Sequence, residues 1–494
     1  MEHEFRLKAI QGFGWNHANK LAEYGILYVF SLVLARFLGA EEYGVYSVVI
    51  SVISLLLVIS SIGFDQALNK FVAQLSEPRQ IEQLRFLVRR LGLIRLGSHV
   101  LLSGGLLVFR YQISVLFKND GIAQYLEIMS LYILFKGMGD FLANVFIGKL
   151  ETKIVFIVNT VNRVLLLAVG TFLLTGGFGL FEVLVVFAGV SGLTFLIFLI
   201  KSKSQIFGRE AYLPLSSVFS FAAANWLFLI VGIGLGRYSD MVLLGGIKGA
   251  GNETGFYDLA YSLTMAIEFV FAMGFMGVVL SVFSKLAHSD PAKLSVARVG
   301  VIQYQQALIL PAGVFCLFHA DAIIVMLVSS EFVAVIPMFQ AFLGFKLASV
   351  VVIGGGVNSA LLLSLGKERV SLMIRSVAGA LNVAVNYLVI PFYGALGALC
   401  VTGAFMVIAT GLEFVSVSKI IGARYDWVFL LKVVLVCCAA VGVSSVIPSE
   451  TISLLTINAL CYVVVIGAGY YTVKLLNTTP QFIKAYINDL FRKG

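Results

Sequence analysis

The stretch Leu32-Val33-Leu34-Ala35-Arg36-Phe37-Leu38-Gly39-Ala40-Glu41-Glu42-Tyr43-Gly44-Val45-Tyr46 decides the fold of this chain. It contains the end of one apolar segment, a tight polar turn and the start of the next apolar segment. A similar turn, Gly249-Ala250-Gly251-Asn252-Glu253-Thr254-Gly255-Phe256-Tyr257, follows about 210 residues later. Both turns carry the pattern Glu-x-Gly-x-Tyr. A turn that occurs once in each half of an apolar chain predicts an internal duplication.

The composition predicts an integral membrane protein. Of the 494 residues, 60% are hydrophobic and 12% are charged, whereas soluble domains have about 25% charged residues. Apolar runs long enough to cross a hydrocarbon core about 30 Å thick recur along the whole chain. These runs are continuous rather than alternating, which favours helices over a barrel. The predicted fold class is therefore an all-α polytopic membrane protein.

Other readings of the composition are weaker. The net charge of +9 fits the basic cytoplasmic loops of a membrane protein better than nucleic-acid binding. The five cysteines lie inside apolar runs without metal or disulfide spacing, so neither a metal site nor a cofactor is expected. No cleavable signal peptide is expected, because the first fifteen residues are polar and lack a cleavage site.

The apolar runs predict fourteen transmembrane spans, including two at the C-terminal end that have no counterpart in the repeat. They are 16–38, 45–67, 91–117, 122–148, 154–175, 180–200, 218–247, 256–283, 297–319, 335–365, 370–390, 394–418, 428–447 and 453–476. Lysines and arginines concentrate in alternate loops, and the opposite loops hold only Lys118 and Lys248. This asymmetry predicts that both termini are cytoplasmic. The inner segment 69–90 is expected to be either an amphipathic helix on the headgroup layer or a solvated loop.

Further echoes extend the repeat. Three short motifs in the first half return in the same order in the second half. They are Phe135-Lys136 with Phe345-Lys346, Gly148-Lys149-x-Glu151 with Gly366-Lys367-Glu368, and Phe178-Gly179-Leu180 with Tyr393-Gly394-Ala395. We therefore expect two parallel six-helix lobes, at 1–210 and 211–425, and an appendage of two helices with a cytoplasmic tail at 426–494.

Charged residues inside the spans are the candidate site, because ionisable groups in hydrocarbon are costly and usually face a cavity, pair or snorkel. The candidates for lining a net-basic cavity are Arg163, Arg237, Lys136, Lys346, Lys20, Arg36 and Arg375. Structural pairing or snorkelling is the alternative, notably for Lys136 with Asp140 four residues on, Lys20 with Glu23, and Arg36. Asp240, Asp65 and Glu268 are candidates for binding a coupling ion, and interhelical hydrogen bonding is their alternative.

Two local patterns refine these candidates. Arg163 shares a helix face with Asn159, and Arg375 shares one with Asn382 and Asn386, which suits a hydrated interior. Gly232, Gly234 and Gly236 precede Arg237, so the seventh span is expected to bend or break there.

Enzyme motifs are missing from the sequence. It contains no phosphate-binding Gly-x4-Gly-Lys-Ser/Thr loop, no His-Glu-x-x-His, no Cys-x-x-Cys and no Gly-x-Ser-x-Gly. The predicted outer loops are too short to assemble a catalytic centre. We therefore expect a transporter rather than an enzyme.

The residues from Leu34 to Tyr46 resemble the polysaccharide-flippase family, the O-antigen and exopolysaccharide transporters of the multidrug/oligosaccharidyl-lipid/polysaccharide exporter superfamily. The resemblance continues through Asp240-x-x-Leu243-Leu244, Gly255-Phe256-Tyr257 and Leu365-Gly366-Lys367. It implies a flippase in a bacterial inner membrane that moves polyprenyl-diphosphate-linked oligosaccharide to the outer leaflet. It also implies a glycan polymerase or other polysaccharide-assembly proteins as partners.

Three alternatives stay open. A flippase for the peptidoglycan precursor lipid II would share the fourteen spans, but arginines would be expected in its first two spans. A cation-coupled multidrug exporter would favour an acidic, aromatic cavity and twelve spans. A membrane glycosyltransferase or polymerase would need a larger outer loop. The sequence identifies neither the glycan nor the coupling ion nor the oligomeric state.

Overall fold

The computed structural model describes residues 2–75, 77–234, 236–290, 293–422, 425–448 and 451–472. Within these ranges all regular elements are helical, which confirms the predicted fold class. They are α1 (Glu2–Ser61), α2 (Phe64–Gln74), η1 (Pro78–Gln80), α3 (Ile81–Leu116), α4 (Ile122–Gly148), α5 (Thr152–Thr175), α6 (Leu180–Lys201), α7 (Lys203–Ile206), α8 (Ser216–Ile233), α9 (Arg237–Lys248), α10 (Asn252–Ser289), α11 (Leu294–Phe318), α12 (Ala320–Leu327), η3 (Ser330–Ala334), α13 (Val335–Lys346), η4 (Leu347–Val352), α14 (Gly355–Ser364), α15 (Glu368–Ile421), α16 (Trp427–Ser444) and α17 (Ile452–Thr472).

The chain divides into two compact units. Unit 1 comprises Met1–Asp258 and Ile390–Gly394, and unit 2 comprises Leu259–Val389 and Ala395–Gly494. The predicted boundaries at 210 and 425 mark the ends of the sequence repeats, whereas these two units are defined by how compactly the chain packs. The predicted boundaries therefore stay a prediction.

Ten helices in the described part of the chain are long and apolar enough to cross a membrane. Two of them, Ala18–Ser61 and Glu368–Ile421, have 44 and 54 residues, and about 20 residues suffice for one crossing. Each contains one glycine with a positive φ, Gly39 (74°) and Gly394 (54°), a conformation that glycine adopts without a steric penalty. Each long helix therefore has room for two crossings, divided at a turn expected from the sequence. The total of fourteen spans stays a prediction.

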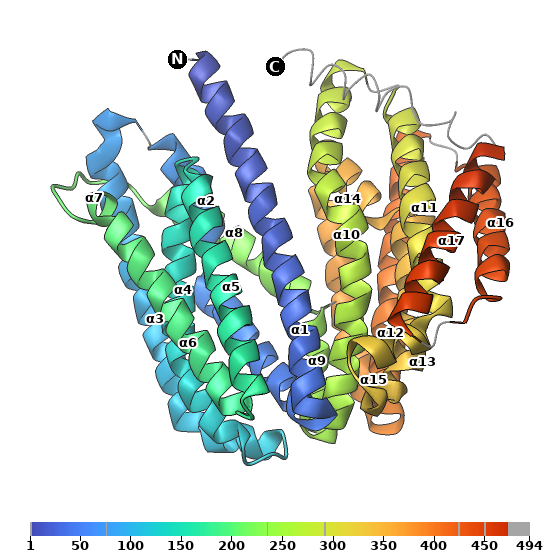
Figure 1. The fold of residues 1–494 in the computed structure, drawn as a ribbon. Coiled ribbons are helices and arrows are strands. Elements are labelled where there is room, and N and C mark those ends of the chain that lie inside the picture. The colour runs from blue at the N-terminus through green and yellow to red at the C-terminus, as the bar shows by residue number, and fades with distance from the viewer. Residues whose placement is uncertain are drawn as a thin grey trace. The chain divides into compact units, whose positions relative to one another are not determined.

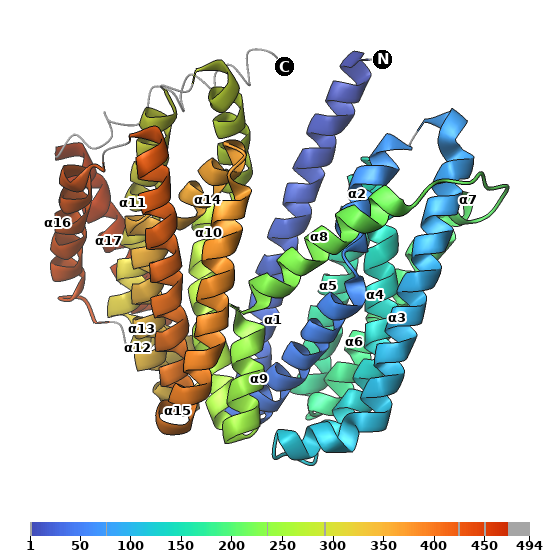
Figure 2. The ribbon, with the colours of Figure 1, turned by 180° about the vertical axis from the view of Figure 1, so that it is seen from behind.

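In unit 1, α4 packs against α3 and α6, and α5 packs against α1 (Figure 1). Figure 2 shows α8 running obliquely past α1 and α2, both of which it contacts. α1 ends before Gly63, whose φ is 69°. The carbonyls at this end accept hydrogen bonds from side chains: Ser61 O from Arg95 Nη1 at 2.5 Å, and Ile59 O from Trp226 Nε1 at 3.1 Å. Because side chains of α3 and α8 satisfy these carbonyls, the helix can end inside the bundle.

Three segments test the expected spans. The seventh span is broken between α8 and α9, as expected from its glycines. The expected span 335–365 overlaps the apolar segment Ser330–Val352, which is long enough to cross a membrane, but it is not one regular helix, because it divides into α13, the π-helical segment η4 and α14, with Gly354 at φ 75°. Residues 81–90 begin α3 and continue directly into the next span. They form neither a separate surface helix nor a loop, because Leu84, Leu87 and Val88 are buried.

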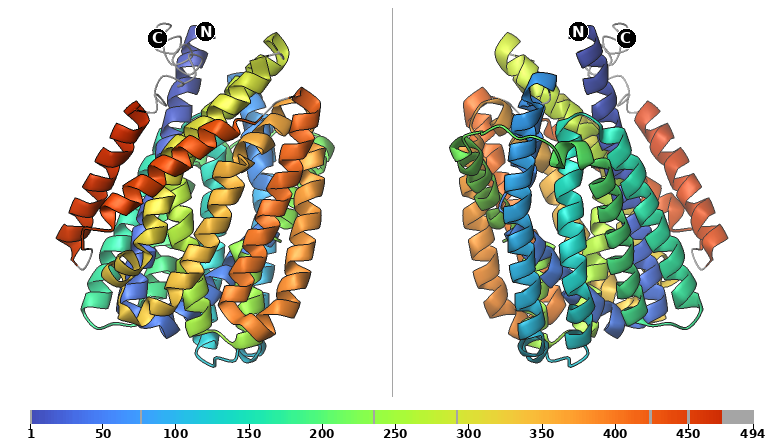
Figure 3. Two further views of the ribbon diagram at one scale, coloured as in Figure 1. Left: turned by 90° about the vertical axis from the view of Figure 1, so that its right-hand side faces the viewer. Right: turned by 90° about the vertical axis from the view of Figure 1, so that its left-hand side faces the viewer.

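In unit 2, α16 and α17 pack against each other and against α11 (Figure 3). The contact is polar as well as apolar: Tyr462 Oη donates to Pro311 O at 3.0 Å and Tyr470 Oη to Ala307 O at 2.6 Å. The last two described helices are therefore an integral part of unit 2.

Candidate functional site

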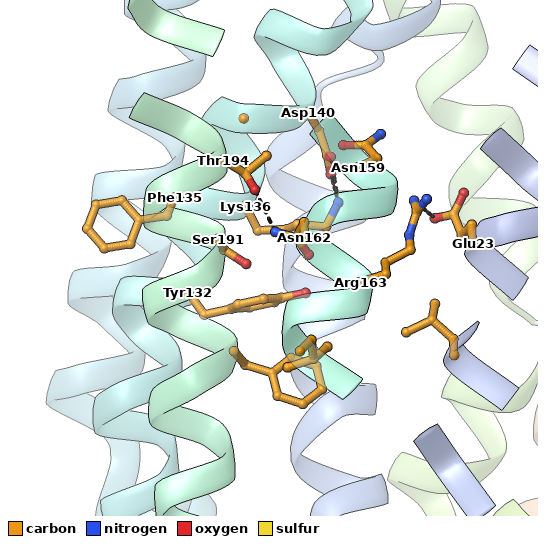
Figure 4. A pocket seen from close by; sticks show the side chains of 14 residues that line it. Glu23, Tyr132, Phe135, Lys136, Asp140, Asn159, Asn162, Arg163, Ser191 and Thr194 are labelled. Atoms are coloured by element: carbon orange, nitrogen blue, oxygen red, sulfur yellow. Dashed lines mark hydrogen bonds and ion pairs between the residues drawn. The ribbon is translucent and has the colours of Figure 1, made fainter. Parts of the chain in front are cut away.

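A polar cavity of about 90 Å³ lies in unit 1 between α1, α4, α5 and α6 (Figure 4). Its lining combines charged, amide, hydroxyl and aromatic side chains within an otherwise apolar bundle. The lining residues are Glu23, Leu27, Tyr132, Phe135, Lys136, Gly139, Asp140, Asn159, Asn162, Arg163, Leu166, Phe187, Ser191 and Thr194. Such polar groups inside a membrane-spanning bundle favour a functional role.

One side of the cavity is an ion pair between α5 and α1. Arg163 Nη2 lies 3.1 Å from Glu23 Oε1, and Arg163 Nη1 donates to Asn19 Oδ1 at 3.2 Å. Lys20 Nζ lies 3.6 Å from the other carboxylate oxygen of Glu23. Arg163 is only 9% exposed, so this pairing offsets the cost of burying its charge.

A second ion pair lies within α4. Lys136 Nζ donates to Asp140 at 2.5 and 2.6 Å, because residues four apart share a helix face. Asn144 connects this pair to a third, donating to Asp140 O at 2.9 Å and to Asp65 Oδ1 at 3.3 Å. Asp65 in turn lies 3.4 Å from Arg95.

The third side of the cavity is uncharged. Asn162 Nδ2 donates to Thr194 Oγ1 at 2.5 Å and to Val190 O at 3.1 Å. Ser191 lies one helical turn from Thr194 on α6, and the ring of Tyr132 lies across the cavity (Figure 4). Hydroxyl, amide and aromatic groups together suit a ligand with hydroxyls and an apolar face.

The lining therefore carries two cations and two carboxylates. It is charge-balanced rather than net-basic as expected, and excess positive charge comes only from Lys20 beside Glu23. Of the seven cationic candidates, Lys136 and Arg163 line this cavity, together with the expected Asn159. Lys20 lies beside it and is exposed.

Three candidate cations form ion pairs elsewhere. In unit 1, Arg237 pairs with the fully buried Asp258. In unit 2, Lys346 Nζ lies 2.7 Å from Glu268, and Arg375 makes a bidentate pair with Glu413 at 2.8 and 3.0 Å.

The remaining candidates lie outside the cavity lining. Arg36 is exposed near the Gly39 break, and Asp240 is buried where it accepts a hydrogen bond from Tyr257 Oη at 2.6 Å. Asn382 and Asn386 are buried with Thr402 rather than facing a hydrated interior.

Several lining residues were missed from the sequence. Tyr132 lies four residues before Lys136 and Asn162 lies three residues after Asn159, so helical spacing from these two residues could have indicated both. Ser191 and Thr194 are three residues apart in a very apolar span, which is a weaker signal. Among the described residues, no group of His, Cys, Asp and Glu side chains could hold a metal ion.

Comparison with known proteins gives the following likenesses. The profile of a family described as "Polysaccharide biosynthesis protein" matches residues 9–287. The succinoglycan biosynthesis transport protein ExoT of Rhizobium meliloti (strain 1021) is 24% identical over 306 residues, which cover 60% of this chain. The match spans 58% of the length of ExoT.

Two solved structures have a similar fold. The lipid II flippase MurJ in an inward closed conformation gives a TM-score of 0.73 at 16% identity, over 93% of this chain and 99% of that one. An inward-facing multidrug resistance MATE family transporter of the MOP superfamily gives 0.62 at 16% identity, over 80% and 94%. At such low identity the likeness concerns the fold alone.

Proposed function

The chain belongs to the polysaccharide biosynthesis protein family, and we propose that it flips a polyprenyl-diphosphate-linked oligosaccharide from the inner to the outer leaflet of a bacterial cell membrane by alternating access. That it is a multi-pass membrane transporter of the MOP superfamily is the premise. The lipid-linked substrate, its direction of movement and cytoplasmic termini are parts of the proposal.

The cavity in unit 1 carries this proposal. A diphosphate with attached sugars cannot cross hydrocarbon unaided, because its charges and hydroxyls would lose their water. Arg163 and Lys136 offer a guanidinium and an ammonium, which bind phosphate oxygens by charge-assisted hydrogen bonds. Asn159, Ser191 and the aromatic rings offer complementary contacts to sugars. The lipid tail stays in the bilayer.

The ion pairs define how an anion would enter. Glu23 and Asp140 neutralise the two cations of the cavity, which avoids leaving buried charges unpaired. A diphosphate would take the place of these carboxylates. When the diphosphate binds, its oxygens replace the carboxylates of Glu23 and Asp140 as the counter-ions of Arg163 and Lys136. The coupling ion would then bind to the displaced carboxylates. The roles of Asp65, Asp240 and Glu268 in coupling remain part of the proposal.

The runner-up functions differ in substrate. The MurJ-like fold suits lipid II, which is also a lipid diphosphate. Arginines would be expected in the first two spans of a lipid II flippase, whereas the cation that α1 places beside this cavity is Lys20, and it pairs with Glu23. The MATE-like fold suits a cationic drug, but the charge-balanced lining together with Lys20 leaves the cavity region net positive, which is repulsive to a cation. Both observations favour the family's own substrate class.

Glycan export in cells lacking the native gene tests the proposal. Lys136→Ala and Arg163→Ala should each abolish restored export while the folded protein remains at its normal level. Lys149→Ala is the matched control, because Lys149 pairs with Glu151 at 2.6 Å outside the cavity lining. Normal export by both cavity variants would refute the assignment of the site.

A further inference from the structure

Unit 2 contains a buried guanidinium without a carboxylate partner. Arg298, in the first turns of α11, is 1% exposed and is among the largest fully buried side chains. Within the described residues it forms no ion pair, and its Nη2 has no hydrogen-bond partner. A buried charge is costly unless it is paired and hydrogen-bonded, so this position requires compensation.

The contacts of Arg298 are with neutral groups. Its Nε donates to Asn358 Oδ1 at 3.0 Å, its Nη1 donates to Ser418 Oγ at 3.1 Å, and its guanidinium carbon lies 4.5 Å from the ring centre of Phe414. Asn358 is fixed in this orientation, because its Nδ2 donates to the carbonyls of Ile353 and Gly354 at the break before α14. None of these groups neutralises the charge.

Two nearby acidic groups do not supply the missing charge. Asp426 caps α16 by accepting from Phe429 N at 3.0 Å, and its other oxygen accepts from Gln303 Nε2 at 2.8 Å. Burial raises the pKa of Tyr425 to about 12, so its phenol stays neutral at physiological pH. Arg298 therefore has no ionic contact with either group, and the Asp426 carboxylate, which lines the same cavity as Arg298, is already held by its own two donors.

Unit 1 also contains a buried arginine, but that one has a carboxylate partner. Arg95 is 2% exposed, and it lies 3.4 Å from the carboxylate of Asp65. Both arginines lie near the cytoplasmic end of a span under the orientation predicted from loop charges. Unit 1 thus neutralises its buried arginine with a side chain, whereas unit 2 provides none among its described residues.

We propose that Arg298 is the anchor of a small-anion site in unit 2, occupied by a halide of the chloride class. Arg298 lines a cavity of about 10 Å³ with Val299, Ile302, Gln303, Gln306, Tyr425 and Asp426. This volume is about the minimum that one water molecule needs, so it excludes a phosphate and leaves a monatomic halide as the anion closest to this size. Both Arg298 Nη2 and Gln306 Oε1 are without a hydrogen-bond partner, and a neutral water molecule in the cavity would leave the charge of Arg298 uncompensated.

Thermal unfolding of the purified full-length protein tests the site. At constant ionic strength, replacing gluconate with chloride or bromide should raise the unfolding midpoint of the wild type in a saturable way. Arg298→Gln should lose at least four-fifths of this rise. Arg95→Gln is the matched control, and it should be less stable in gluconate yet keep the full rise. An equal halide response of Arg298→Gln and the wild type would overturn the proposal.

Bromide soaked into crystals of the wild-type protein gives a second, independent measurement. An anomalous peak within hydrogen-bonding distance of Arg298 Nη2 is expected. Density without an anomalous signal there, as a water molecule would give, would overturn the proposal. This measurement decides the question even if Arg298→Gln does not fold, and neither result depends on which lipid the protein transports.

Discussion

Gly44 and Gly255, which occupy the same position in the two copies of the repeated turn, lie directly against each other. A Cβ on Gly44 would lie 2.8 Å from the backbone nitrogen of Gly255, and a Cβ on Gly255 would lie 3.2 Å from the backbone nitrogen of Gly44. The repeated turn is thus a packing corner in which each copy contacts the other, and only glycine allows this approach.

Adding a methyl group at either glycine should destabilise the protein. The new Cβ would lie 1.8 Å from Gly251 O in Gly44→Ala and 2.3 Å from Ala40 O in Gly255→Ala. Both neighbours are backbone atoms, so we expect a loss of about 1–3 kcal/mol for each variant, measured as a lower unfolding midpoint in detergent. Gly246→Ala is the control, since its Cβ would meet nothing within 4 Å. Equal midpoints for all three variants would contradict this packing.

The same corner holds a buried carboxylate with three donors. Asp258 pairs with Arg237 and accepts from Tyr43 Oη at 2.8 Å and Ser47 Oγ at 2.9 Å. Asp258→Asn leaves Arg237 without its counter-ion and should cost about 3–5 kcal/mol of folding stability. Tyr43→Phe removes one hydrogen bond to a charged group and should cost about 1.5–3 kcal/mol. Unfolding midpoints that rank Tyr43→Phe as the more damaging change would refute this account.

The helix breaks and the contacts within single helices were predictable from the sequence. Glycines indicated the breaks at Gly39 and Gly394, and the four-residue spacing of Lys136 and Asp140 indicated their pair. Arg163 and Asn159, which were predicted to share a helix face, both line the cavity. In each case the deciding interaction lies within one helix or one turn, where periodicity fixes geometry.

The contacts between residues far apart in the chain were not predictable from the sequence. Periodicity places Arg163 and Arg375 on a helix face but does not tell which helix covers that face. Their partners Glu23 and Glu413 come from positions far away in the chain. Asn382 and Asn386 form a polar stripe that suggested water, yet the returning half of α15 covers them with Thr402. Tertiary contacts decide whether a polar stripe lines a cavity or closes a packing contact.

The counter-ion exchange predicts the effect of removing a carboxylate from the cavity. Asp140→Asn and Glu23→Gln leave Lys136 or Arg163 without a competing anion, so a short-chain polyprenyl diphosphate should bind more tightly. We expect a gain on the order of tenfold, which corresponds to about 1.4 kcal/mol, in an equilibrium titration of the purified protein. Glu151→Gln is the control, because Glu151 pairs with Lys149 outside the cavity lining. Weaker binding by both cavity variants would argue that the carboxylates contact the ligand themselves.

The predicted orientation can be checked with single cysteines in a variant whose five native cysteines are replaced by alanine. Asp120 and Tyr212 are exposed and lie in loops of opposite predicted sides. An impermeant maleimide should label Asp120→Cys in intact cells and Tyr212→Cys only after the membrane is opened. The reverse pattern would invert the topology and place the termini outside.

Translocation in proteoliposomes tests the central claim most directly. The lipid-linked oligosaccharide pool of the native cells is labelled, incorporated with the purified protein, and followed by its accessibility to an impermeant reagent. The wild type and Lys149→Ala should move the lipid far faster than protein-free vesicles, and Arg163→Ala and Lys136→Ala should lose at least nine-tenths of that rate. Unchanged rates in both cavity variants, or a wild-type rate equal to that of protein-free vesicles, would contradict the account.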